Sequence, residues 1–200
     1  LGLTGDQGRD LVSVINAYQP NVLIGTSGQA SSFDEPVVRA MAEATERPVI
    51  LPMSNPTDIS EAVPEDVLRW TAGKALVATG SPFADVPMRG GNQRIGQANN
   101  VFIFPGLGLG TIVSHATEVT DGMIGASSKA LADSLTDEEI AANCLMPEVS
   151  RLWEICGRVA VAVAQRAMRD GVAPEIGDDE LDQKLADYRW RPEYPEIIES

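Results

Sequence analysis

Three short apolar runs, each ending in a loop of small or polar residues, constrain the fold of this chain more than any other feature. The runs cover residues 21–25, 49–53 and 75–79, and segments with helical spacing separate them. Such alternation is typical of βαβ units, in which parallel strands build one sheet. We therefore expect a parallel sheet in the first half of the chain.

The second half has the apolar spacing of helices. This spacing predicts helices over residues 107–118, 120–135 and 148–169, and Gly171 is a natural stop for the third. Residues 101–105 form either a short strand or the entry to a helix, and residues 178–188 an acidic surface helix. The expected fold class is α/β, namely the distal part of a doubly wound (Rossmann-like) parallel sheet followed by a C-terminal helical block. We expect the first part to cover residues 1–135, and the helical extension and tail to cover residues 136–200.

The amino-acid composition makes several kinds of binding partner unfavourable. The 200 residues carry a formal net charge of −14, which makes nucleic acid and anionic membrane surfaces poor partners. No Lys/Arg cluster interrupts the acidic balance in the sequence, and no apolar run has the roughly 20 residues of a membrane span. Cys144 and Cys156 fit neither a disulfide framework nor a zinc motif, which favours a cytoplasmic protein. Because the chain opens at Leu1 rather than at methionine, we expect a piece of a longer protein.

The loops that follow the apolar runs are the candidate binding residues. Ligands of open parallel sheets bind beyond the carboxyl ends of the strands. Gly25-Thr-Ser-Gly28, Ser54-Asn-Pro-Thr57 and Gly80-Ser-Pro-Phe83 stand at three such ends, and Asn99 and Asn100 follow soon after. Glycine would let the backbone approach a planar ring or a phosphate, and asparagine amides both donate and accept hydrogen bonds. Ordinary turn chemistry is the alternative reading of each loop.

Other chemically interesting residues have plainer explanations. Gly106-Leu-Gly-Leu-Gly110 follows a proline and lacks the acidic residue of a dinucleotide fingerprint, which favours close helix packing. His115 lies on a predicted apolar helix without a metal-binding or catalytic partner, which favours a structural histidine. Cys156 lies on the inner stripe of the clearest helix and reads as an inert core thiol. The pattern alone therefore predicts a nucleotide-binding half-domain with amide-rich loops.

Three long motifs add a resemblance. The segments 47–57 (RPVILPMSNPT), 70–83 (WTAGKALVATGSPF) and 97–110 (QANNVFIFPGLGLG) resemble the C-terminal part of malic enzymes. Residues 25–28 upstream and residues 120–123 (TDGM) downstream keep the same order, so the resemblance covers about residues 21–171. Malic enzymes oxidise L-malate with NAD or NADP and decarboxylate bound oxaloacetate to pyruvate, using Mn²⁺ or Mg²⁺.

The resemblance implies roles for particular residues. Asn55 would bind a malate carboxylate and lie beside the nicotinamide ribose, and Asn99 and Asn100 would hold the substrate. The residues implied for the cofactor cleft, in the distal part of the NAD(P)-binding domain, are Gly25, Thr26, Ser27, Gly28, Ser54 and Asn55. Neutral amides suit this task because they orient a dicarboxylate without competing with a metal ion.

The resemblance also implies what this chain lacks. The family's catalytic tyrosine and lysine, its malate-binding arginine, its metal ligands and its Gly-rich dinucleotide fingerprint belong to segments upstream of Leu1. Tyr18, Tyr188 and Tyr194 do not match the catalytic tyrosine. We therefore expect no catalytic residue and no metal ligand in this chain, and no malate turnover by the chain alone.

Two other functions remain open. A malolactic enzyme, which converts malate to lactate, shares these motifs, and a catalytically inactive module that binds a dinucleotide or a dicarboxylate comes from a different class. A bare acidic scaffold would leave the loops unexplained. Malic enzymes form oligomers, so the aromatic tail from Trp190 to Ile198 is expected to pack on another subunit or on a further domain of a full-length homo-oligomer.

Overall fold

A computed structural model describes residues 3–188 and residue 194 of the chain. Contacts divide the chain into two compact units. The sheet unit comprises residues 1–99 and 135–148, and the helical unit comprises residues 100–134 and 149–200. The expected boundary between residues 135 and 136 falls where the chain returns to the sheet unit, and the functional division into two domains stays a prediction.

Four parallel strands form the sheet, in the order β1-β2-β3-β6. They are β1 (Val22–Gly25), β2 (Val49–Pro52), β3 (Leu76–Thr79) and β6 (Gly96–Gln97). The pairs Ile24 with Leu51 and Ile50 with Val77 define the register of the first three strands. The first three apolar runs are thus neighbouring strands, as the sequence predicts, and the α/β, Rossmann-like fold class is confirmed.

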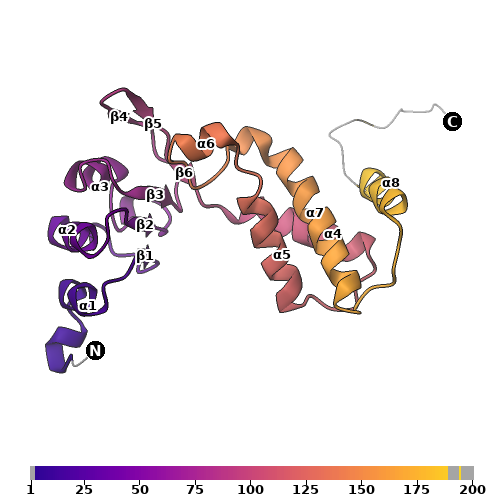
Figure 1. The fold of residues 1–200 in the computed structure, drawn as a ribbon, viewed down its shortest axis with the longest axis horizontal. Coiled ribbons are helices and arrows are strands. Elements are labelled where there is room, and N and C mark those ends of the chain that lie inside the picture. The colour runs from indigo at the N-terminus through magenta and orange to yellow at the C-terminus, as the bar shows by residue number, and fades with distance from the viewer. Residues whose placement is uncertain (1–2, 189–193, 195–200) are drawn as a thin grey trace. The chain divides into compact units, whose positions relative to one another are not determined.

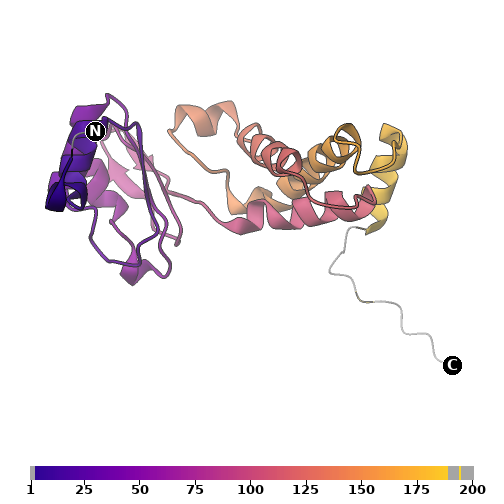
Figure 2. The ribbon, with the colours of Figure 1, turned by 90° about the horizontal axis from the view of Figure 1, so that it is seen from below.

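Helices α1 (Leu11–Tyr18), α2 (Glu35–Ala44) and α3 (Pro64–Trp70) cover one face of this sheet (Figures 1 and 2). On β1, Leu23 points into the core beneath the helices, whereas Val22 and Ile24 are 46% and 62% exposed. Helix α2 begins where the sequence predicts, because the Asp34 carboxylate accepts a hydrogen bond from the backbone N–H of Val37.

A hairpin and a returning segment complete the sheet unit. Strands β4 (Val86–Met88) and β5 (Gly91–Gln93) pair antiparallel, and residues 135–148, which include α6 (Asp137–Ala141), pack beside them. Arg94 attaches this segment, because its guanidinium forms an ion pair with Glu139 and donates to the carbonyl oxygen of Met146 at 2.8 Å. No local sequence pattern indicated this return.

The helical unit contains α4 (Phe104–Val113), α5 (Asp121–Ala132), α7 (Leu152–Arg169) and α8 (Asp178–Tyr188). Helix α7 packs along both α4 and α5 (Figure 1). A methyl group on Gly106 would lie 2.6 Å from the Val159 Cβ, and one on Gly110 would lie 2.5 Å from the carbonyl oxygen of Ala160. The glycines therefore serve close packing of α4 against α7, as the sequence indicates.

Several helix boundaries differ from the sequence prediction. Residues 101–105 are the entry to a helix, because α4 begins at Phe104 with Pro105 in its first turn, where proline is tolerated. Helix α4 ends at Val113, so His115 lies beyond the helix, exposed and with φ +55°, and not on its apolar face. The acidic helix α8 also contributes Leu181 and Leu185 to a buried cluster with α4 and α7. The predicted contact of the tail Trp190 to Ile198 lies outside the described residues, apart from the exposed Tyr194.

Candidate functional site

The loops that follow β1, β2 and β3 lie together at the carboxyl edge of the sheet. These strands are parallel neighbours, so their carboxyl ends meet on one side. Parallel sheets place ligands at this edge. The structure thus brings together three of the loops that the sequence singles out, namely residues 25–28, 54–57 and 80–83.

Ser54 connects the first two loops. Its hydroxyl accepts a hydrogen bond from the backbone N–H of Gly28 at 2.9 Å and donates to the Glu61 carboxylate at 2.5 Å. Ser54 as a whole residue is 8% exposed, so these bonds are largely sheltered from water. Gly28 itself has φ +65°, a left-handed conformation that favours glycine.

Glu61 is a buried carboxylate beneath these loops, with 0% exposure. In addition to Ser54, it accepts hydrogen bonds from the backbone N–H of Ser27 at 2.7 Å and from the Ser27 hydroxyl at 2.9 Å. Burial alone would raise the pKa of Glu61, but hydrogen bonds from Ser54, from the backbone of Glu61 and from Ser27 lower it to about 2. Glu61 is therefore ionised at neutral pH and holds two loops through neutral donors.

Sequence reasoning missed Glu61. The pair Ser60-Glu61 resembles a helix start, but α3 begins only at Pro64, with Val63 as its N-cap. The available signal was the position of Glu61, which lies too far upstream of the first apolar helical residue, Val67, for a first-turn carboxylate. Because Glu61 is a charged residue between Ile59 and Ala62 and does not serve a helix start, its position indicated a role in tertiary structure.

Asn55 lies exposed at the edge, between the second and third loops. The buried Ser81 hydroxyl donates to the Asn55 Oδ1 at 3.2 Å, which directs the amide nitrogen of Asn55 away from Ser81. The two loops approach closely, since a methyl group on Gly80 would lie 2.0 Å from the carbonyl oxygen of Met53. The Asn55–Pro56 peptide bond is cis. This arrangement offers an oriented amide donor to a ligand.

Asn99 and Asn100 are both exposed but belong to different units. Asn99 follows β6 at the end of the sheet unit, and Asn100 begins a 3-10 turn that ends at the fully buried Phe102 of the helical unit. Their assignment to substrate remains a prediction. Thr26 and Ser27 are exposed in the first loop, and their assignment to a cofactor likewise stays a prediction.

Metal ligands do not gather in the part of the chain that the structure describes, where no group of three His, Cys, Asp or Glu side chains could hold an ion. Within the same residues, no helix has the length and apolar character needed to cross a membrane.

The Cys156 thiol is half-buried and donates to the carbonyl oxygen of Val101.

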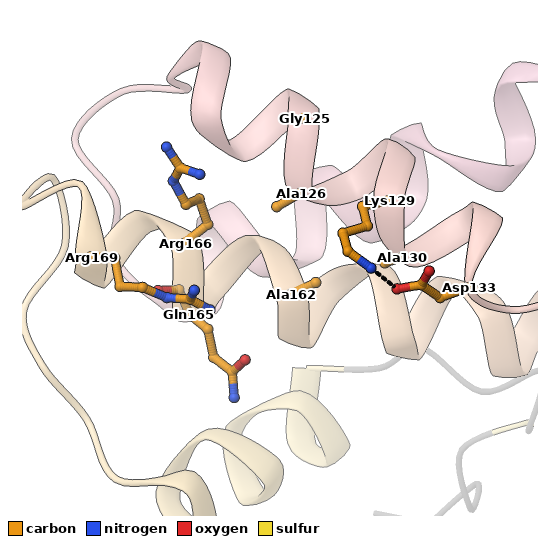
Figure 3. Close-up of a pocket in the computed structure, with 9 residues that line it drawn as sticks. All are labelled: Gly125, Ala126, Lys129, Ala130, Asp133, Ala162, Gln165, Arg166 and Arg169. Atoms are coloured by element: carbon orange, nitrogen blue, oxygen red, sulfur yellow. Dashed lines mark hydrogen bonds and ion pairs between the residues drawn. The ribbon is translucent and has the colours of Figure 1, made fainter.

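A hollow with cationic side chains lies between α5 and α7 (Figure 3). Lys129 of α5 and Arg166 and Arg169 of α7 line it, so the packing of the two helices brings these basic side chains together. Lys129 is paired with Asp133, and Arg166 with Asp170 at 2.6 Å. The hollow contains none of the predicted site residues, and its ion pairs offset much of its positive charge, so we place the candidate site at the sheet edge.

Comparisons with known proteins identify the family to which this chain is similar. The family described as "Malic enzyme, NAD binding domain" matches residues 3–168. The chain is 46% identical over 184 residues to the NAD-dependent malic enzyme of Acinetobacter baylyi, covering 92% of this chain and 32% of that protein. It is also 46% identical over 190 residues to NAD-dependent malic enzyme 3 of Bacillus subtilis, covering 95% of this chain and 33% of that protein. The chain thus spans about a third of the length of these relatives.

Solved structures show the same fold. Malic enzyme from Pyrococcus horikoshii superposes with a TM-score of 0.68 at 24% identity, over 88% of this chain and 36% of that chain. The malic enzyme of Entamoeba histolytica gives a TM-score of 0.70 at 22% identity, over 89% of this chain and 34% of that chain.

Proposed function

Because the chain belongs to the malic enzyme family, we propose that it is the distal part of the cofactor-binding domain of an enzyme that converts L-malate to pyruvate and CO₂ with NAD. The observation that carries this proposal is the hydrogen-bonded edge at which Ser54 joins Gly28 and Ser81 orients Asn55. The NAD-dependent relatives favour NAD over NADP. The proposal includes a cytoplasmic location and an oligomeric full-length protein.

In this proposal the carboxyl edge of the sheet binds malate and NAD and orients them relative to each other. NAD, when bound, would supply the hydride acceptor for C2 of malate, and the residues of the sheet edge would hold that carbon and the nicotinamide ring in register. Asn55 donates its amide hydrogens to a malate carboxylate and to the nicotinamide ribose, while Ser81 keeps the amide from rotating. Asn99 and Asn100 hold the substrate, and residues 25–28 with Ser54 form part of the cofactor cleft.

The residues present fit a dinucleotide better than a metal ion. The edge offers small residues, hydroxyls and an oriented amide, which suit a ribose and a planar ring. The proposal assigns the Mn²⁺ or Mg²⁺ ligands, the catalytic tyrosine and lysine and the malate-binding arginine to other segments of the full-length protein, as the resemblance to malic enzymes implies.

A replacement at Asn55 tests the proposed role. In the full-length protein, Asn55→Ala should raise the KM for malate by roughly 10- to 100-fold, because a hydrogen bond to a charged carboxylate is worth about 1.5–3 kcal/mol. Asn16→Ala, at an exposed position on α1, is the control. An unchanged KM for malate would remove Asn55 from the substrate site.

The chain alone should be inactive. The 200-residue chain incubated with malate, Mn²⁺ and NAD or NADP should give no absorbance of reduced cofactor at 340 nm, since acid, base and metal ligands lie elsewhere in the proposal. Steady turnover above the blank would contradict this. With the full-length protein, pyruvate and net NADH are expected, and lactate as the product would instead support a malolactic enzyme.

A further inference from the structure

The loop after β1 has already used the backbone donors that a phosphate would need. Glycine-containing loops bind phosphate through successive N–H groups that converge on an anion. Here the N–H of Ser27 donates to Glu61, the N–H of Gly28 to the Ser54 hydroxyl, and the N–H of Gln29 to the Ser27 hydroxyl at 3.1 Å. Three successive donors are therefore satisfied inside the protein.

The Glu61 carboxylate is itself an anion held at this place. Four of its hydrogen bonds come from the backbone and hydroxyl groups of Ser27 and Ser54, with the Ser54 N–H at 3.2 Å. None of the ion pairs formed by the described residues includes Glu61. A buried negative charge without a cationic partner repels a second anion, and the low local dielectric strengthens this repulsion.

The packing of Glu61 explains why position 25 is a glycine. A methyl group on Gly25 would lie 2.7 Å from the Glu61 Cδ and Cγ and from the Phe33 Cζ. Phe33 also contacts the backbone of Glu61, since the N–H of Phe33 donates to the Glu61 carbonyl oxygen at 2.9 Å. The glycine at the strand end thus admits the carboxylate beneath the loop, and it is not evidence for an approaching phosphate.

We propose that Glu61 is a positioning and specificity residue of the cofactor cleft, which fixes the loops after β1 and β2 and closes the first of them to phosphate groups. This inference rests on the proposed function. It assigns residues 25–28 to an uncharged part of the dinucleotide, a ribose or the nicotinamide ring, and sends the pyrophosphate to other segments of the protein.

Hydrogen exchange measured by mass spectrometry tests this in the full-length protein, without depending on activity. Amides of residues 25–31 should exchange slowly in the wild type, and inorganic pyrophosphate should leave their rate unchanged. In Glu61→Ala they should exchange roughly tenfold faster, because the bonds to a charged acceptor are lost. Pyrophosphate should then slow them again by occupying the released donors. Glu43→Gln, an exposed carboxylate on α2, controls for the change in net charge.

A second variant protects the test against misfolding. Glu61→Gln keeps the shape and removes the charge, so it should accelerate exchange at residues 25–31 and raise the KM for NAD roughly tenfold, with a much smaller change in kcat. Pyrophosphate protection of residues 25–31 in the wild type would overturn the inference, as would an unchanged exchange rate in both variants. An unchanged KM for NAD in an otherwise loosened loop would also overturn it. A wild-type protein that does not oxidise malate with NAD would refute the proposed function, and the pyrophosphate experiment would still decide the role of Glu61.

Discussion

Two glycines of α4 provide a matched test of how closely α4 and α7 pack. Gly108 is exposed, and a methyl group there would meet no atom within 4 Å. Gly110 is buried, and a methyl group there would lie 2.5 Å from the Ala160 carbonyl oxygen and 2.8 Å from the Val163 Cβ. The same substitution to alanine therefore has opposite consequences two residues apart.

The magnitudes follow from propensity and overpacking. Alanine stabilises a helix interior by about 1 kcal/mol relative to glycine, so Gly108→Ala should stabilise the helical unit by about that amount. Overpacking costs about 1–3 kcal/mol, and at Gly110 the upper end applies because the obstacle is backbone of α7. After the same propensity gain, Gly110→Ala should destabilise by about 2 kcal/mol. The two variants should differ by about 3 kcal/mol.

Thermal and urea unfolding, followed by circular dichroism at one pH, measure this difference. For 150–250 residues, about 3 kcal/mol corresponds to a difference in Tm of roughly 6–12 °C. The urea m-values of the two variants should agree, so that the midpoints report stability. If Gly110→Ala proved as stable as Gly108→Ala, α4 and α7 would not approach as closely as described, and the packing explanation of Gly110 would fail.

Two further predictions concern the sheet unit. The pKa of Glu61 is lowered from its ordinary value of 4.5 to about 2, so its contribution of at most about 3 kcal/mol is present above pH 4.5 and is lost as the pH falls to about 2. Glu61→Gln should flatten the pH dependence of the free energy of unfolding over this range, and parallel curves for the two proteins would contradict the assignment. Arg94→Ala removes an ion pair with Glu139 and a donor to the Met146 carbonyl oxygen, and should cost about 1–3 kcal/mol in urea unfolding, whereas Arg89→Ala, at an exposed position, should cost less than about 0.5 kcal/mol.

The parts of the fold that were predictable from sequence depend on local pattern. Strands β1, β2 and β3 appear as apolar runs that end in turn residues, and α7 as a long amphipathic period. The start of α2 is local too, since Asp34 caps a donor three residues away. Helix α4 begins at Phe104, three residues before the predicted start at residue 107, because the first turn of a helix accepts proline.

The central contact of the candidate site was not predictable in this way. Glu61 meets Ser27 across 34 positions in the sequence, and neither residue carries a local sign of the other. The loops themselves were found because strand ends in a parallel sheet converge. The carboxylate of Glu61 accepts hydrogen bonds from both the first and the second loop, and only the tertiary structure reveals this contact.

The return of residues 135–148 to the sheet unit has a consequence for protein engineering. The chain passes between the units at residues 99–100, 134–135 and 148–149, so neither unit is one continuous stretch of sequence. A truncation after residue 99 would leave Arg94 without Glu139 and Gly96 without Met146, whose Cβ lies 2.8 Å from the position of a methyl group on that glycine. A transplantable sheet unit would therefore need a linker that replaces residues 100–134, and a domain exchange between relatives would need to carry residues 135–148 together with the sheet.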